Sequence, residues 1–277
     1  MSATIAKASL LTLPAELRLA ILSHVLIQPP NVSFKPSNSK TLPHLKGLEL
    51  DPNYSSSTHL EILLTCRQFQ DDFTGLAFRR TTFHITDMFS PFATLLQPLS
   101  NHHIQNLRRI VVVAGARQFR DMVHWVKWPF NMEELQLESL TIAMHTSTHW
   151  HYPSDFTSDM VGLLRRLQNV KVLRFVLNRA NVKGFFKTWY NRLIGLMLKE
   201  DHFQRYDAPG APIKEKTWWI WSYDENARLF ELLAQKPKPV MNEADYMEMV
   251  KPWVERLVAD METEEEDTDP RARNGWG

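Results

Sequence analysis

Residues 104–113 read IQNLRRIVVV, and residues 167–176 read LQNVKVLRFV. In both stretches the apolar residues follow one another at steps of three, three and two: Ile104, Leu107, Ile110 and Val112, then Leu167, Val170, Leu173 and Phe175. A third stretch keeps the last part of this frame with Leu137, Leu140 and Ile142, although Glu134 stands where the first apolar residue would be. Each frame ends in a short apolar run, which predicts a strand.

Helical patterns fill the gaps between these runs. We expect strands at 82–86, 108–113, 138–144, 172–177 and 218–223, and helices at 91–99, 118–128, 155–167 and 182–200. Strands that alternate with helices at this spacing predict a parallel sheet with right-handed crossovers. The return of the frame after about 30 residues favours an irregular leucine-rich-repeat arc, in which each unit buries its face against its neighbours. An ordinary two-layer or three-layer α/β sheet is the alternative, because the repeat's asparagines are missing at the expected turns.

The N-terminal segment predicts two helices. The first runs from about residue 13 to 28, with Pro14 at its start, where the missing N–H of proline costs nothing. Its apolar residues form two stripes, Leu17, Ile21 and Val25 on one and Leu19, Leu22 and Leu26 on the other. A short helix that is apolar on two sides needs two neighbours. One is its own domain, and the other is either a partner protein or more of the same core.

The second helix is predicted over residues 59–79, with one apolar stripe made of Ile62, Cys66, Phe69, Phe73 and Leu76. Cys66 on this stripe is expected to be a small buried hydrophobe. Between the two helices, residues 31–58 are rich in Pro, Ser and Asn and show no sustained period, which predicts a mobile insertion that acts as a spacer.

The C-terminal part predicts two more helices. Asp224 is placed to cap the first of them, and the second carries the stripe Tyr246, Val250, Trp253 and Leu257, with Pro252 kinking or restarting it. An acidic tail follows. The expected organisation is therefore a helical module at 1–86 with a Pro/Ser-rich insertion at 29–58, a repeat-like α/β domain at 87–260, and an acidic disordered tail at 261–277.

Composition excludes several classes of protein. The chain has 277 residues, of which 44% are hydrophobic and 23% charged, as in ordinary globular proteins. The 32 Lys and Arg residues against 31 Asp and Glu leave a net charge of +1, which argues against a protein that coats nucleic acid. A single cysteine and no long apolar run favour an intracellular protein, cytoplasmic or nuclear, without disulfides or membrane spans.

Residues with a possible role in chemistry are few. His145, His149 and His151 are the densest group of metal-ligating residues, but the glutamate of an H-E-x-x-H motif is absent, so a polar loop is the preferred interpretation. Glycine-rich phosphate loops and G-x-S-x-G elbows do not occur in this sequence of nine glycines. Trp218, Trp219 and Trp221 indicate a buried strand, with a pocket wall as the alternative. The pairs Arg79-Arg80, Arg108-Arg109 and Arg165-Arg166 mark the ends of predicted elements, and two of them would form a basic edge if the arc is correct.

Three segments resemble the F-box-like proteins that are abundant in fungi. LTLPAELRLAIL at 11–22 resembles the L-P-x-E-[LI]-x-x-x-I opening of an F-box. LLTCRQF at 63–69 and RTTFHI at 80–85 resemble its closing helix and the strand typical of the fungal group. The resemblance implies a helical module that binds the small adaptor subunit of cullin-RING ubiquitin ligases. By that match the adaptor-facing residues would be Leu13, Pro14, Leu17 and Ile21, although the insertion is longer than an ordinary F-box contains.

These observations together predict an α/β protein with an F-box-like helical module packed on an irregular, repeat-like arc of parallel strands and helices, and with a helical C-terminus. The expected function is non-enzymatic protein-protein interaction, as a substrate-recruiting adaptor of a ubiquitin ligase, with an unknown protein target and no cofactor, catalytic residue or metal. The alternatives are a metal-assisted hydrolase around His145, His149 and His151, and a nucleic-acid binder that uses the paired arginines.

Overall fold

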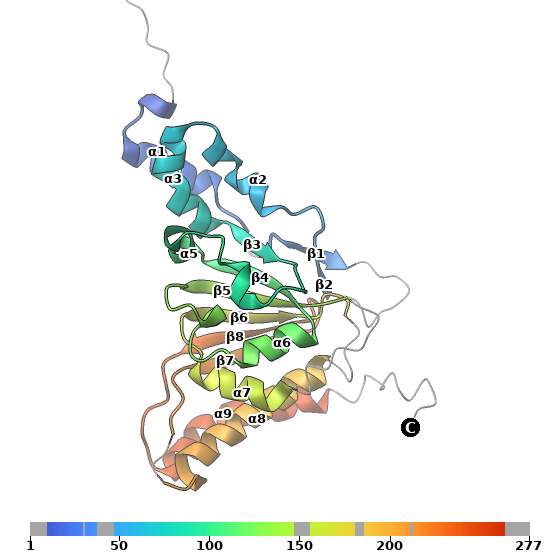
Figure 1. Ribbon diagram of the computed structural model, residues 1–277. Coiled ribbons are helices and arrows are strands. Elements are labelled where there is room, and N and C mark those ends of the chain that lie inside the picture. The colour runs from blue at the N-terminus through green and yellow to red at the C-terminus, as the bar shows by residue number, and fades with distance from the viewer. Residues whose placement is uncertain are drawn as a thin grey trace, which may run out of the picture.

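A computed structural model describes residues 10–29, 31–37, 47–146, 156–180, 186–210 and 213–263. It shows a mixed α/β fold around a six-stranded sheet, with helices from the N-terminal segment at one end and two long C-terminal helices at the other (Figure 1). Along the sheet the strands lie in the order β3 Thr82–Ile85, β4 Arg109–Ala114, β5 Leu137–Met144, β6 Val170–Val176, β8 Leu229–Gln235 and β7 Trp218–Asp224.

The repeated apolar frame sets the register of the parallel part of the sheet. Strands β3 to β6 are parallel and lie side by side in chain order. Ile110 of β4 pairs with Leu140 of β5, which pairs with Leu173 of β6, and the next buried row is Val112, Ile142 and Phe175. All six side chains are almost completely buried. The five strands predicted from the sequence are therefore confirmed.

The prediction of a helix after Asp224 is wrong. Residues 225–228 form a turn, in which the Asp224 carboxylate accepts a hydrogen bond from the backbone N–H of Ala227 at 2.9 Å. The chain then returns as β8, which pairs with β7 and inserts antiparallel between β7 and β6. Buried Phe230 and Leu232 alternate with Glu231 and Leu233, which is the period of a strand. Because β8 alone runs against the other five strands, the sheet is mixed.

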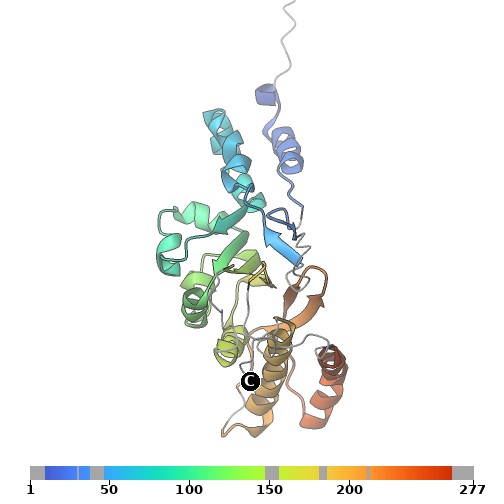
Figure 2. The same ribbon diagram turned by 90° about the vertical axis from the view of Figure 1, so that its right-hand side faces the viewer.

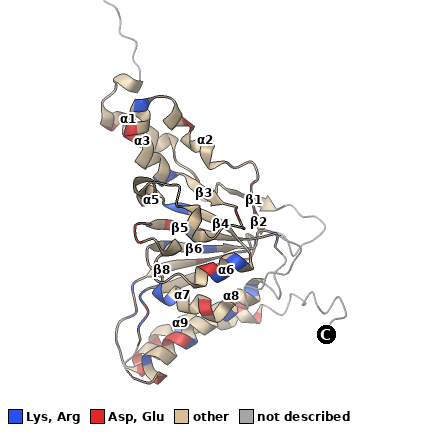
Figure 3. Ribbon diagram, viewed as in Figure 1, with Lys and Arg blue, Asp and Glu red and all other residues tan. Residues whose placement is uncertain are grey.

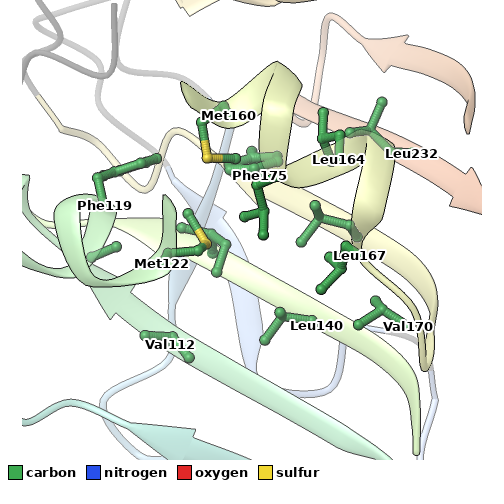
Figure 4. Close-up of a cluster of buried hydrophobic side chains, with 14 of the residues drawn as sticks. Val112, Phe119, Met122, Leu140, Met160, Leu164, Leu167, Val170, Phe175 and Leu232 are labelled. Carbon is green, nitrogen blue, oxygen red and sulfur yellow. The ribbon is translucent and has the colours of Figure 1, made fainter. Parts of the chain in front are cut away.

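Helices cover one face of the sheet. They include α4 Phe92–Leu95, α5 Asn101–Asn106, α6 Ala116–Val123, α7 Thr157–Arg166 and α8 Phe186–His202. Figure 4 shows the contact, with side chains of α6 and α7 packed over the buried rows of β4, β5, β6 and β8. The labelled side chains are Val112, Phe119, Met122, Leu140, Met160, Leu164, Leu167, Val170, Phe175 and Leu232. Burial of this apolar face is the main source of stability for the sheet.

The insertion is not a plain spacer in its described part. It contains the hairpin β1 Phe34–Ser37 and β2 Gly47–Leu50, followed by α2 Ser56–Leu60. The backbone N–H groups of Leu48 and Leu50 donate to the Ala227 carbonyl at 2.9 Å and the Asn178 side chain at 2.8 Å. Gly47 has a φ of 139°, and a Cβ there would stand 2.8 Å from the Ala227 oxygen. The hairpin is thus fixed beside the end of β6 and the turn between β7 and β8, on the side of the sheet away from α6 and α7 (Figure 2).

The second predicted helix is interrupted. Residues 61–64 form the 3₁₀ helix η3, Cys66 has an extended backbone, and the long helix α3 begins only at Arg67 and ends at Arg80. Cys66 is half-buried against the small N-terminal core. The apolar stripe continues across the break, so periodicity alone could not reveal it.

The N-terminal segment is joined to the outer strand β3 by side chains. The backbone N–H of Thr82 donates to the Gln28 amide oxygen at 3.0 Å, and the hydroxyls of Tyr54 and Ser56 donate to the Thr82 carbonyl at 2.7 and 2.9 Å. The ring of Tyr54 also packs on His84, with 4.6 Å between ring centroids. The strand that follows α3 is therefore the first strand of the sheet, and the insertion contributes to its outer edge.

A buried ionic cluster fastens the C-terminal helices. Asp201 of α8 is fully buried and receives four side chains: Arg165 and Arg205 at 3.0 Å, Lys238 at 2.7 Å and the Tyr246 hydroxyl at 2.5 Å. Tyr246 belongs to α9 Glu243–Glu262, which contains Pro252 within an uninterrupted helix. A second buried acid, Glu215, pairs with Arg205 at 2.7 Å and with Lys238 at 3.3 Å. Each charge in the cluster has a partner, which is what burial of charge requires.

The remaining predicted segments are placed as follows. Helix α8 begins at Phe186, since residues 181–185 of the helix predicted over 182–200 lie outside the described residues. Residues 261–263 of the predicted tail end α9, and residues 264–277 also lie outside. None of the helices in the described part of the chain combines the length and the apolar character needed to cross a membrane.

We expect Asp201→Asn to lower the free energy of unfolding by about 3–5 kcal/mol, because Arg205 and Lys238 then share the single carboxylate of Glu215 and Arg165 loses its carboxylate partner. Burial raises the pKa of Asp201, but the charge of Lys238 and the hydrogen bonds to it hold that pKa well below its usual range. The folded pKa is thus below the unfolded value of about 4, so Asp201 stabilises the fold above about pH 4 and this contribution is lost as the pH falls below it. Urea unfolding of both proteins from pH 7 to pH 3 measures this loss.

Glu225→Gln is the control for an exposed ion pair. It removes an exposed partner of Arg228 and should lower the free energy of unfolding by at most about 1 kcal/mol.

His84 gives a second, separate pH dependence. Burial lowers the pKa of His84 from 6.5 to about 4. Protonation is therefore easier in the unfolded chain, and we expect the stability that depends on neutral His84 to fall as the pH drops from about 6.5 to about 4. A His84→Gln variant should show a flatter melting temperature over this window than the wild-type chain. Parallel curves for the two proteins would contradict the assignment.

Candidate functional site

The first helix exposes an apolar surface at the end of the molecule that is farthest from the C-terminal helices. Helix α1 runs over Ala15–Val25 and packs beside α3 (Figure 1). Only one edge of α1 is buried, where Leu22 and Leu26 contact a small core separate from that of the sheet. The α3 side of this core consists of Phe69, Phe73, Leu76 and Ala77. Of the predicted stripe Leu19, Leu22 and Leu26, the last two face the domain, whereas Leu19 is 46% exposed.

Arg18 fixes the position of the helix relative to α3. Its side chain is buried, and its Nη2 lies 2.5 Å from the Asp72 carboxylate on α3. Its Nη1 donates to the carbonyl oxygens of Leu13 at 2.9 Å and Leu11 at 3.3 Å, so the same guanidinium also closes the turn that precedes α1. Sequence reasoning missed Arg18, because its partner is 54 residues away and no local pattern connects them.

Four leucine, isoleucine and valine side chains of α1 are exposed, and three of them form one row. Leu17, Ile21 and Val25 follow one another at intervals of four and are 52%, 41% and 64% exposed. We call them the α1 stripe. Leu17 and Ile21 belong to the four residues that the family resemblance marks as adaptor-facing, and Val25 extends their row by one helical turn. The apolar spacing in the sequence placed Val25 on the same stripe, although the family resemblance did not mark it as adaptor-facing.

The other two predicted site residues lie at the start of the same helix. Pro14 occupies the N-cap position of α1 and is exposed, while Leu13 is half-buried. The structure therefore brings Leu13, Pro14, Leu17 and Ile21 together on one end of the molecule. The α1 stripe itself is aliphatic, and the exposed Glu16 stands between Pro14 and Leu17 in the first turn of the helix.

The histidine group gives no metal centre in the described residues. His145 lies just after β5, and His149 and His151 lie outside the described residues. Across the described ranges, no three His, Cys, Asp or Glu residues stand close enough together to hold a metal ion.

Another histidine, His202, lines a cleft of about 480 Å³ between α7 and α8. Ser158 lines the same cleft. The His202 ring nitrogens lie 3.3 Å from Asp207 and 2.9 Å from Glu243. Since both nitrogens face carboxylates, neither is left to activate the Ser158 hydroxyl for hydrolysis. The cleft therefore does not support a serine hydrolase.

The three tryptophans of β7 and the pair Arg165-Arg166 make contacts within the fold. Trp218, Trp219 and Trp221 are buried on β7, which confirms the strand interpretation. Arg165 belongs to the buried ionic cluster, and Arg166 donates to the carbonyls of Val123 and Trp125 at 2.7 and 3.0 Å. Figure 3 shows acidic and basic residues intermixed over α6 to α9. These surroundings do not favour a nucleic-acid interface at this part of the molecule.

No protein family model, no curated protein and no solved structure matches the chain.

We expect the two stripes of α1 to differ sharply in their effect on stability. Leu22→Ala opens a cavity in the α1–α3 core and should lower the free energy of unfolding by about 2–5 kcal/mol. Leu17→Ala removes an exposed side chain and should change it by at most about 0.5 kcal/mol. Equal losses in urea unfolding would mean that the α1 stripe is part of the core.

Proposed function

We propose that this chain is a non-enzymatic interaction protein whose N-terminal helices form an F-box-like module that docks on the adaptor subunit of cullin-RING ubiquitin ligases. The observation that carries the proposal is the α1 stripe, a row of aliphatic side chains left uncovered on a helix whose opposite edge is fixed by Leu22, Leu26 and Arg18. In this proposal the sheet and the C-terminal helices hold a protein target.

The spacing of the stripe fits recognition of one helix face by a groove. Partners that bind amphipathic helices contact residues three, four and seven or eight positions apart. Full burial of a leucine or isoleucine side chain contributes about 1.5–3 kcal/mol, and a side chain that is half exposed still has roughly half of this to gain. Three such residues together contribute roughly 2–5 kcal/mol to docking, and a helix that does not have to rearrange loses none of it to reordering.

The surroundings of the stripe favour a preformed site. Arg18 connects α1 to α3 and to the preceding turn, so the helix is held before any partner arrives. The Gln28 side chain, just beyond α1, bonds the backbone of β3. A partner on α1 would thus be held at a defined distance from whatever the sheet binds, which is what delivery of a target to a ligase requires.

The remainder of the chain fits a target-holding role by its shape. The parallel strands repeat one apolar frame on their helix-covered face, and their other face is only partly covered by the β1–β2 hairpin. We include in the proposal that β3 to β6 are irregular repeats of the leucine-rich kind.

The experiment is co-purification of the full chain with the ligase adaptor subunit, using one charged substitution on each flank of α1. Leu17→Asp places a carboxylate in the stripe and should reduce capture of the adaptor at least about tenfold, because a buried unpaired charge costs several kcal/mol. Leu19→Asp is the matched control, since Leu19 is 46% exposed on the opposite flank of the same helix. We expect Leu19→Asp to retain capture.

Two results would count against the proposal. Failure of the folded wild-type chain to capture the adaptor would mean that α1 has another role. Equal loss for Leu17→Asp and Leu19→Asp would show that the stripe is not the contact. Thermal melting of both variants within a few degrees of wild type shows that the comparison is between folded proteins.

A further inference from the structure

A cleft of about 220 Å³ lies on the face of the sheet that the helices do not cover. One wall is formed by the uncovered face of β4, β5 and β6. The other is formed by residues of the segment that follows α1, among them Gln28, Asn31, Ser33 and Phe34. Most of the lining side chains are polar, which distinguishes this cleft from the apolar rows on the helix-covered face.

The strand register places two arginines around two hydroxyl groups. Arg109 of β4 is paired with Ser139 of β5, and Thr141 of β5 is paired with Arg174 of β6. All four side chains line the cleft. Neighbouring strands are about 4.8 Å apart, so β4 and β6 stand about 10 Å apart with the hydroxyls of β5 between them. Arg174 stands two residues farther along the strands than Arg109, so the two arginines lie diagonally on either side of the hydroxyls of β5.

Each arginine is held in place by one carboxylate and keeps donors for a ligand. Arg174 uses its Nε to bond Glu231 of β8 at 2.6 Å, which leaves its two Nη groups for the cleft. Arg109 lies 3.2 Å from Glu138, and its Nη1 donates to the Arg80 carbonyl at 3.3 Å. A guanidinium has five N–H donors, so neither set of bonds exhausts it.

We propose that this cleft binds an oxyanion, a phosphate or a carboxylate group, between Arg109 and Arg174 and over the hydroxyls of Ser139 and Thr141. Planar guanidinium groups match the paired oxygens of such groups, and hydroxyls donate to the oxygens that remain. Among the described residues that line the cleft, two are arginines and one, Glu138, is acidic, and Glu231 lies beside Arg174. Glu231 competes with the ligand for Arg174 and sets the affinity.

A phosphorylated or acidic side chain of a peptide would supply this group, as would a free anion. The assignment of the cleft to the protein target rests on the proposed function, whereas the oxyanion site itself does not. Because the second wall is the segment directly after α1, a bound group would also contact the connection between the adaptor-docking helix and the sheet.

The test is titration of the full chain with three probes: capped phosphoserine, capped glutamate and inorganic phosphate, at constant ionic strength. Binding is followed by the shifts of backbone and arginine side-chain NMR signals. We expect Arg174→Gln to weaken phosphoserine binding about tenfold or more, since a charge-assisted hydrogen bond is lost. Glu231→Gln should strengthen it several-fold by removing the competing carboxylate. These opposite effects at the two ends of one ion pair would not arise from loss of stability.

Two further variants keep the test decisive. Thr141→Val preserves the shape of a buried residue without its hydroxyl and should weaken binding severalfold. Arg120 is an exposed residue of α6, on the other side of the sheet from the cleft. Arg120→Gln should therefore leave binding unchanged. Equal weakening by Arg120→Gln and Arg174→Gln would reduce the effect to general charge and overturn the proposal. The proposal would also be overturned if Glu231→Gln did not bind phosphoserine more tightly, or if the NMR signals of the cleft residues showed no saturable shift.

The probes also separate the two sources. Tighter binding of a capped residue than of inorganic phosphate assigns the site to a peptide, and the reverse order assigns it to a free anion. Leu17→Asp should bind the probes as wild type does, so loss of adaptor capture and loss of oxyanion binding are independent results.

Discussion

Ile110, Leu140 and Leu173 form one buried row across three parallel strands, and the arrangement of the other elements depends on that row being covered. An apolar row on a sheet must be packed against another layer, and the helices between the strands supply that layer. Because every crossover helix is used on this face, the opposite face is left to segments from elsewhere in the chain. The hairpin β1–β2 and the residues after α1 cover part of it, and the polar cleft is what remains.

The two ends of the molecule are held by different kinds of interaction. At the C-terminal end, five charged side chains and Tyr246 meet in the protein interior, and their mutual hydrogen bonds offset the cost of removing the charges from water. At the N-terminal end, a small apolar core and the single guanidinium of Arg18 hold two helices together. The smaller contact leaves more of α1 uncovered, which is why the proposed docking surface lies there.

Much of the fold could be predicted from the sequence. The steps of three, three and two identified the strands around Ile110 and Leu173, and the stripe pattern identified α1. The errors occurred where local patterns were ambiguous. Residues 229–235 are apolar enough for a helix or a strand, and only pairing with β6 and β7 decides between them. In the described part of the insertion, the hairpin is fixed by bonds to Asn178 and Ala227, which no local pattern announces.

The candidate sites show the same division. Leu17 and Ile21 are exposed, and which flank of α1 is covered depends on Arg18 reaching Asp72. Arg109 and Arg174 come from strands that are far apart in the chain, and only the register brings them around the hydroxyls of β5. A sequence can indicate that each is on a strand, but it cannot show that they share a face with Ser139 and Thr141.

The bonds to Thr82 also bear on how the protein behaves in concentrated solution. An open strand edge is a template on which another chain can add its own strand and begin an aggregate. In β3 the N–H and the carbonyl of Thr82 are already occupied by Gln28, Tyr54 and Ser56, and the strand is only four residues long. Too few backbone groups remain for a new strand to pair there. The contacts that attach the helical module to the sheet therefore also protect this edge against self-association.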